Sequence, residues 1–388
     1  MRLLFVPKRL GLSHLIPLLS LNAKLTDASI KRAFLAPYKH HAHLRAMGID
    51  VLNIDHERTE RGLRNEIAAY QQFRPDMVID DCCFTTGIAA GIMGIPRITI
   101  QRTGMFPGMM PKSLSSKYPP SIGVGPENFH NLNLNPEQRE ILASYVEAKV
   151  KIVPGIRTIE VLPSDLKNNL TYHFSGPLLM GDSDLQIFGR QDLKGSNAID
   201  IGLDESLGRF FEANKKRKII YITFGLIAKP GGLVIDAVRY LLDNDMAVVS
   251  SLKAPDLDKK QEERYYFSNF LPMHYVCSHA DLMIHHGGCA TYHYPIIHNV
   301  PMITVGTVSS DREGVSLRLQ ELGASIHLPA PAECEEFPQK FAAAIRRYFG
   351  DSGVFMEKRK QKLRELKMEI DQTCALFNFQ EIIRQALS

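Results

Sequence analysis

The sequence predicts an α/β protein with two doubly wound parallel sheets that face each other across a cleft. Apolar strand segments alternate with amphipathic helical segments twice along the 388 residues, and this alternation favours parallel strands joined by right-handed crossovers. A chain of this length is long for one core, and the stretch 179–204 is rich in Gly, Asp and Ser. We therefore expect one domain at 1–180, a linker at 181–204 and a second domain at 205–356.

The first half opens on an apolar strand at 2–6, a run too short for a signal peptide. Apolar runs with the length of strands follow it at 31–36, 51–54, 77–79, 97–100, 151–153 and 158–161. Segments with helical periodicity lie between them at 15–25, 62–73 and 87–93.

The second half repeats the pattern. Its strands are expected at 218–223, 247–251, 275–277, 282–284, 302–305 and 325–328. Helices are expected near 232–243, 291–298 and 312–322. Beyond residue 356, a charged helix at 357–369 and an apolar-striped segment at 376–387 follow. We predict that these C-terminal helices, 357–388, pack back toward the first half.

Composition excludes several classes of function. A net charge of +4 is too mild for a dedicated nucleic-acid-binding protein, and no apolar stretch is long enough to span a bilayer. The six cysteines are scattered without a CxxC pair, which favours a reduced protein. We expect a cytoplasmic monomer or homodimer without nucleic-acid partners and without stable membrane insertion.

The segment from His285 to Thr291 is the most informative part of the chain. An apolar strand ends at the paired His285 and His286, and Gly287 and Gly288 then let the backbone turn sharply. A helix that starts near Thr291 would present amides without intrahelical partners to an anion such as phosphate. An ordinary strand–glycine–helix junction is the alternative explanation of the same residues.

A second chemical pattern follows the first strand. His14 stands at the start of the first predicted helix, where a neutral imidazole can act as a general base. Asp80 and Asp81 end the strand near 77–79, so a carboxylate at this edge is placed to orient that histidine. The alternatives are that His14 is a polar first-turn residue and that the two acids cap a helix.

Five motifs in order resemble the UDP-glycosyltransferase superfamily, glycosyltransferase family 1, and most closely its bacterial natural-product members. They include Gly11-x-Ser13-His14-x-x-Pro17, the stretch from Arg74 to Asp81, and Tyr221-Ile-Thr-Phe-Gly225. The continuous stretch from His286 to Leu328 is the most specific of them. The loops around 101–135 and the linker do not match, so the resemblance covers most but not all of the chain.

The resemblance implies the GT-B fold, two Rossmann-like domains across a cleft, with the acceptor bound by 1–180 and the nucleotide sugar by 205–356. It also implies roles for individual residues. His14 and Asp81 would be catalytic, Asp311 and Arg312 would hold the donor sugar, and Tyr294 would lie in the ribose region. The residues implied for the nucleotide diphosphate are Thr223, Gly225, His286, Gly287, Gly288, Cys289, Ala290 and Thr291.

Three positions depart from the family pattern. Tyr294 replaces a glutamate that often holds the ribose, and Leu226 replaces a serine after Phe-Gly. Arg312 stands where glutamine is common, and arginine is a bidentate partner for carboxylates. One hypothesis that follows is an acidic donor sugar.

The function expected from these residues is inverting transfer of a sugar from a UDP- or dTDP-sugar to a hydroxyl of a small, largely apolar acceptor. We expect no cofactor and no metal, because the strings Asp182-Ser-Asp184 and Asp256-Leu-Asp258 fall in the predicted linker and a polar loop. Three alternatives stay open: a nucleotide-sugar epimerase of the same fold, a non-catalytic partner protein, and a lipid-acceptor transferase that dips the loop 105–112 into a membrane.

Overall fold

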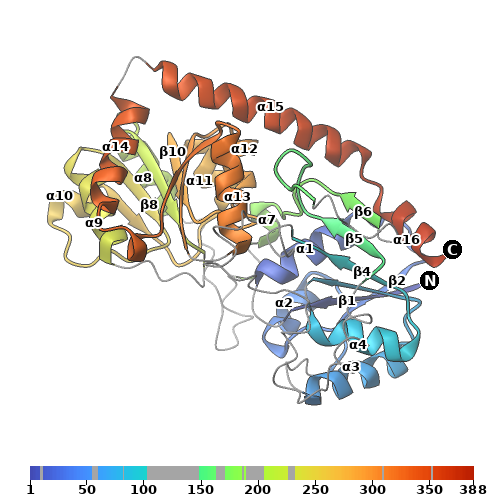
Figure 1. The fold of residues 1–388 in the computed structure, drawn as a ribbon. Helices are drawn as coiled ribbons and strands as arrows, with labels where there is room; N and C mark the ends of the chain where they lie inside the picture. The colour runs from blue at the N-terminus through green and yellow to red at the C-terminus, as the bar shows by residue number, and fades with distance from the viewer. Residues whose placement is uncertain are drawn as a thin grey trace.

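Two six-stranded parallel sheets, one in each half of the chain, form the framework of the protein (Figure 1). The computed structural model describes residues 1–8, 12–54, 60–81, 83–102, 148–162, 171–185, 188, 205–225, 232–307, 310–350 and 353–388. The predicted α/β class with parallel strands is confirmed. The predicted domain boundaries stay predictions.

The first sheet has the order β2-β1-β3-β4-β5-β6, so its winding reverses between β1 and β3. Its strands are β1 (Arg2–Pro7), β2 (Lys31–Phe34), β3 (Met77–Asp81), β4 (Arg97–Ile100), β5 (Val150–Val153) and β6 (Thr171–Phe174). Its helices include α1 (Leu12–Ala23), α2 (His41–Ala46), α3 (Glu60–Phe73) and α4 (Phe84–Met93). Leu3 and Phe5 of β1 enter the core cluster under α1, whereas Leu4 and Val6 enter the cluster under α3 and α4. Both faces of the strand are thus buried, which explains its uninterrupted apolar run.

The second sheet has the order β12-β11-β10-β7-β8-β9 and reverses between β7 and β10. Its strands are β7 (Ile219–Thr223), β8 (Ala247–Ser250), β9 (Tyr265–Phe267), β10 (Leu282–His285), β11 (Met302–Val305) and β12 (Ser325–Leu328). The helices around it are α8 (Glu205–Asn214), α9 (Gly232–Asp243), α10 (Lys259–Glu262), α11 (Met273–His279), α12 (His293–Ile297), α13 (Ser310–Glu321) and α14 (Phe337–Phe349). Core clusters cover both faces of this sheet as well.

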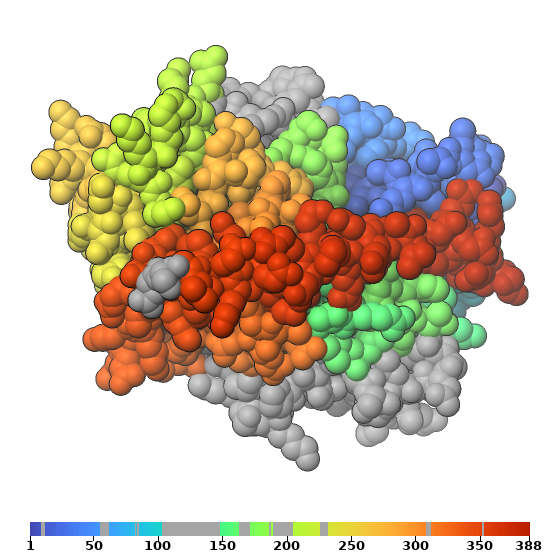
Figure 2. Space-filling view, turned by 90° about the horizontal axis from the view of Figure 1, so that it is seen from above, coloured from blue at the N-terminus to red at the C-terminus, as the bar shows by residue number. Residues whose placement is uncertain are grey.

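The long helix α15 (Val354–Leu376) joins the two halves and is followed by α16 (Phe379–Leu387). Seen from above, α15 runs across the molecule from the second half to the first (Figure 2). Leu363 and Leu366 pack beside Ile156 of the first half and Tyr292 of the second, and Ile383 of α16 enters the first core. Among the helices of the described residues, none is long and apolar enough to cross a membrane.

A buried hydrogen bond lies in the same contact between the halves. The hydroxyl of Tyr292 donates to Glu160 Oε1 at 2.7 Å, and both residues are almost completely buried. Burial, followed by the charge of Glu160, raises the pKa of Tyr292 well above its ordinary value, so the hydroxyl keeps its proton. A Cβ on Gly155 would meet both side chains within 2.7 Å, so only glycine leaves room for the pair.

We expect Tyr292→Phe to lower the free energy of unfolding by about 1–3 kcal/mol, because the buried carboxylate of Glu160 loses a donor. Urea unfolding of the variant beside the wild-type protein measures this loss. Tyr266→Phe is the matched control, since its hydroxyl is only partly buried beside Ser206 Oγ at 3.0 Å. Equal stability of the two variants would contradict the prediction.

Three of the predicted strands are wrong. Residues 275–277 lie in α11, residues 158–161 form a turn, and residue 51 makes only an isolated bridge to Phe34. Short apolar runs do not distinguish a strand from a buried helix. In α11 the carboxylate of Asp182 accepts from the amides of His274 at 3.3 Å and Tyr275 at 2.7 Å, which favours a helix start there.

Candidate functional site at the two facing sheet edges

The predicted site residues lie where the winding of each sheet reverses. His14 is in α1, directly after β1, and Asp81 ends β3, which pairs with β1 in the register Pro7↔Asp81. In the second sheet, Thr223 ends β7 and pairs with His285 at the end of β10. Ligands of open parallel sheets bind at such reversal points, beside the carboxyl ends of the strands.

The structure brings His14 and Asp81 together. Nδ1 of His14 lies 3.2 Å from Oδ1 of Asp81, and the two side chains are 12% and 0% exposed. Burial is the main cause that lowers the pKa of His14; Asp81 raises it, and Arg102 lowers it. The imidazole is therefore neutral near physiological pH, as a general base must be.

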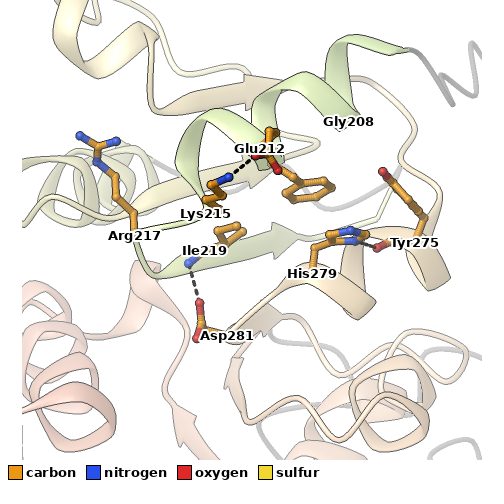
Figure 3. A pocket seen from close by; sticks show the side chains of 9 residues that line it. Gly208, Glu212, Lys215, Arg217, Ile219, Tyr275, His279 and Asp281 are labelled. Carbon is orange, nitrogen blue, oxygen red and sulfur yellow. Dashed lines mark hydrogen bonds and ion pairs between the residues drawn. The ribbon is translucent and has the colours of Figure 1, made fainter.

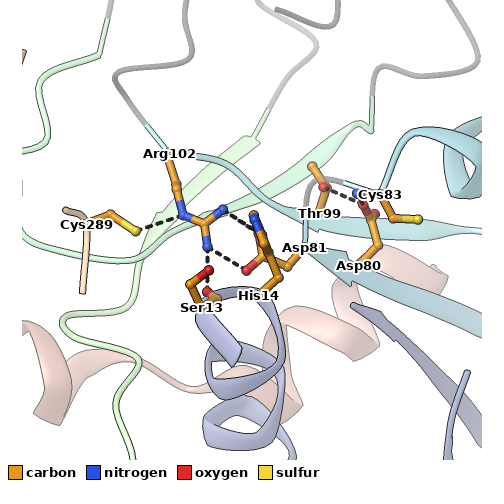
Figure 4. Close-up of polar contacts among 8 residues, drawn as sticks. All are labelled: Ser13, His14, Asp80, Asp81, Cys83, Thr99, Arg102 and Cys289. Carbon is orange, nitrogen blue, oxygen red and sulfur yellow. Dashed lines mark hydrogen bonds and ion pairs between the residues drawn. The ribbon is translucent and has the colours of Figure 1, made fainter. Parts of the chain in front are cut away.

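Arg102, which the sequence analysis did not predict as a site residue, contacts the carboxylate of Asp81 (Figure 4). Its Nη1 and Nη2 donate to Oδ1 and Oδ2 of Asp81 at 2.8 and 2.7 Å, and Nη2 also donates to the carbonyl of Ser13 at 3.0 Å. Its Nε lies 2.9 Å from Sγ of Cys289 in the second half. The available signal was its place two residues after β4, at the edge of the sheet where Asp81 lies.

The segment from His286 to Thr291 forms a tight turn after β10. Gly287 has a φ of 73°, in the left-handed region, and its amide donates to Nδ1 of His285 at 3.1 Å. The amides of Thr291 and Tyr292 donate to the carbonyl of Gly288 at 2.8 and 3.2 Å. The predicted helix is present as α12, but it begins at His293, two residues after Thr291, because these two amides close the turn first.

His286 connects this turn to the end of β7. A Cβ on Gly225 would lie 3.3 Å from its ring, and a Cβ on Gly288 would lie 2.5 Å from its Nε2, so both glycines let the ring fit. Thr223 Oγ1 lies 3.2 Å from the hydroxyl of Ser251 on the same edge. Burial and the charge of Arg312 lower the pKa of His286 to about 3, so the ring is neutral and offers one N–H donor.

The residues implied for the sugar and the ribose lie around this turn. The carbonyl of Arg312 in α13 faces Gly287, and the backbone of Asp311 lies in the same helix, but its side chain is outside the described residues. Tyr294 is 4% exposed, packs in the core with Met283, and meets the ring of His274 edge-on at 4.8 Å. Leu226, the loop 105–112 and Cys82 also lie outside the described residues.

One aspartate of each Asp-x-Asp string caps a helix, while Asp184, Asp256 and Asp258 stay exposed. Asp182 accepts from the first amides of α11, and Asp258 forms a capping box with Gln261 at the start of α10. In the part of the chain that the structure describes, no three histidine, cysteine or acidic side chains gather as a metal site would require.

Burial of neutral histidines makes the stability of the fold depend on pH. Burial lowers the pKa of His285, His286 and His293 to about 3, from an ordinary value of 6.5. Between these values the unfolded chain binds more protons, so we expect stability to fall as the pH drops below about 6.5. Each such histidine adds roughly 1.4 kcal/mol per pH unit to the slope of the free energy of unfolding. The pKa of Asp80 is raised to about 6, so below that pH this carboxyl cancels the effect of one histidine on the slope.

Urea unfolding at about pH 7 and about pH 5 measures this slope. His293→Phe should reduce this slope by roughly 1.4 kcal/mol per pH unit, because that variant lacks one of the titrating rings. A free energy of unfolding that does not change over this interval, or a slope that the variant leaves unaltered, would contradict the assignment.

A separate pocket of about 430 Å³ lies between α8 and α11 (Figure 3). The rings of Phe211 and His279 stack in its wall at 4.5 Å, and Ile219 and Asp281 lie at its floor. Ile219 begins β7 and Asp281 precedes β10, so the pocket is at the amino ends of these strands. It is therefore at the opposite edge of the sheet from the predicted site.

Part of the second half is similar to a known protein family. Residues 241–369 match the family described as "Erythromycin biosynthesis protein CIII-like, C-terminal domain". A curated relative, the 3-alpha-mycarosylerythronolide B desosaminyl transferase of Saccharopolyspora erythraea, is 23% identical over 72% of this chain and 62% of its own length. The other curated relatives are matched over 27–32% of theirs.

Solved structures similar to this chain extend over its whole length. The spinosyn rhamnosyltransferase complexed with thymidine diphosphate has a TM-score of 0.67 at 18% identity, over 98% of this chain and 100% of that one. Phytolacca americana UGT2, complexed with UDP-2-fluoro-glucose and pterostilbene, has a TM-score of 0.70 at 15% identity over 100% of both chains. The chain has the GT-B fold. These structures confirm the GT-B fold that the resemblance implied, and in this GT-B chain the His14–Asp81 pair and the His286–Thr291 turn belong to opposite halves.

Proposed function

We propose that this GT-B chain is an inverting glycosyltransferase that moves a sugar from a UDP- or dTDP-sugar to a hydroxyl of a small, largely apolar acceptor. One observation carries the proposal: a neutral histidine–aspartate pair and a glycine turn lie at the reversal points of two facing sheets. The contact between Arg102 and Cys289 at 2.9 Å brings these two features side by side.

The geometry supports a single displacement. His14 Nε2 takes the proton of the acceptor hydroxyl, and the oxygen attacks the anomeric carbon on the face opposite the leaving group. The bond from that carbon to the diphosphate oxygen breaks through an oxocarbenium-like state, which inverts the configuration. Asp81 orients the ring and stabilises the imidazolium that forms.

The leaving diphosphate gains charge as the bond breaks. The amides of Gly287 and Thr291 already donate within the turn. We therefore propose that the N–H of His286 and the amides from Gly288 to Ala290 stabilise this charge, with the positive charge of Arg312 nearby. With these donors the reaction requires neither a divalent metal nor a cofactor, so the nucleotide sugar is a co-substrate. We propose a cytoplasmic protein; Arg312 also keeps an acidic donor sugar as a hypothesis.

A donor and acceptor screen tests the proposal. UDP-glucose, UDP-glucuronate and dTDP-glucose are each incubated with the protein, alone and with an apolar phenol or a macrolide, and products are identified by mass spectrometry and NMR. We expect nucleotide release that requires an acceptor. Conversion of the sugar without an acceptor would instead indicate an epimerase, and nucleotide binding without turnover of any pair would favour a non-catalytic partner protein.

A further inference from the structure

The guanidinium of Arg102 and the carboxylate of Asp81 compete for the same nitrogen of His14. Nδ1 lies 3.1 Å from Nη1 of Arg102 and 3.2 Å from Oδ1 of Asp81. Because a guanidinium stays protonated, it contacts Nδ1 favourably only when that nitrogen has no proton. The neutral ring then carries its proton on Nε2, where it has no lone pair to accept the proton of a hydroxyl.

The charge of Asp81 is directed at Arg102 more than at His14. Both carboxylate oxygens accept from the guanidinium at 2.8 and 2.7 Å, and these bonds are shorter than the contact to the ring. The charged groups that act on His14 are Asp81 at the end of β3, Arg102 after β4 and Lys8 after β1. Burial and the two cations lower the pKa of His14, whereas Asp81 raises it, so the contact with Arg102 weakens the support that Asp81 gives to the imidazolium.

The same guanidinium extends into the other half of the molecule. Its Nε donates to Sγ of Cys289, which lies in the turn proposed for the diphosphate (Figure 4). Arg102 is almost fully buried between the two features. Phosphate oxygens bind the planar guanidinium in two-point contacts, as Asp81 does, and a diphosphate carries more negative charge than one carboxylate.

We propose that Arg102 is a positioning residue that holds His14 in its inactive tautomer until a nucleotide diphosphate on the turn draws the guanidinium away from Nδ1. This inference rests on the proposed function. Once Arg102 moves, Nδ1–H donates to Asp81 and Nε2 becomes the base. The donor therefore activates the base before the acceptor hydroxyl is deprotonated, and donor binding precedes productive acceptor binding.

Ring ¹⁵N NMR of His14 tests this directly, with the signal assigned by His14→Asn. The wild-type protein is measured free and then saturated with UDP or with dTDP, whose binding is confirmed by calorimetry. We expect the proton on Nε2 in the free protein and on Nδ1 in the nucleotide complex. A proton on Nδ1 in the free protein would overturn the inference, and so would a nucleotide that binds without moving the proton; the proposed function survives both outcomes. Absence of binding by either nucleotide contradicts the proposed function itself.

Arg102→Met separates this role from a structural one. We expect the variant to place the proton on Nδ1 without nucleotide and to raise the proton affinity of His14 by about tenfold. Arg97→Met is the matched control: it removes an equally buried arginine that contacts Asp80 at 3.1 Å on the same strand, and it should leave His14 unchanged. Identical spectra for Arg102→Met and the wild-type protein would overturn the inference, and if that variant does not fold, the wild-type titration decides alone.

Discussion

We expect His14→Ala to reduce the proposed sugar transfer by about 10²–10⁴-fold in kcat/KM, because the acceptor hydroxyl would lose its general base. The only base in contact with the aspartate at the reversal point of the first sheet is this ring, 3.2 Å from Asp81, as far as the described residues show. Initial rates with a donor–acceptor pair that the wild-type protein turns over measure the loss.

Nucleotide affinity is the control for this variant. The side-chain contacts of His14 are to Asp81 and Arg102, both in the first half, whereas the turn proposed for the diphosphate lies in the second. We therefore expect calorimetry to show that the variant binds UDP at least as tightly as the wild-type protein, because loss of the ring only removes one contact of Arg102. Full transfer activity of His14→Ala would remove the histidine from the mechanism, although the chain would still be a transferase.

The His14–Asp81 pair could be predicted because a parallel sheet leaves little choice. Once β1 and β3 are recognised as neighbouring parallel strands, a residue after β1 and a residue at the end of β3 must lie at the same edge of the sheet, independently of the loop conformations. The same rule accounts for Thr223 and His285, which end the neighbouring strands β7 and β10. In each case the sequence pattern determines the strand, and the strand determines where the polar residue at its end lies.

Arg102 and α11 could not be predicted in this way, because they depend on contacts between distant residues. Asp182, which caps α11, is 92 residues away from His274 in the sequence. The residues 275–277 alone do not indicate that a distant carboxylate accepts hydrogen bonds from the first amides of this helix. Arg102 follows a recognised strand, but its two-point contact with Asp81 and its bond to Cys289, 187 residues away, depend on how the halves meet. Local patterns do not contain that information.

We expect Gly287→Ala to strain the backbone of the turn and to disturb its packing against α13. The φ of 73° at this position is disfavoured for any residue with a Cβ. The added Cβ would also lie 2.1 Å from Ser316 Oγ and 2.8 Å from the carbonyl oxygen of Arg312. The hydroxyl can rotate away, but the carbonyl belongs to α13 and cannot move without the helix. We expect the free energy of unfolding to fall by about 2 kcal/mol or more, and UDP affinity to fall by at least about tenfold.

Gly314→Ala provides the matched control, because it adds the same methyl group to α13 where no atom lies within 4 Å. That variant should be as stable as the wild-type protein or more stable by up to about 1 kcal/mol, since alanine favours a helix. Urea unfolding and UDP calorimetry are measured on both variants under conditions where both are folded. If Gly287→Ala lost stability but bound UDP normally, the turn would matter for the fold alone. Loss of affinity in the folded variant, with Gly314→Ala unaffected, would tie the diphosphate to the backbone of this turn, because both changes add one methyl group and only Gly287→Ala adds it to the turn.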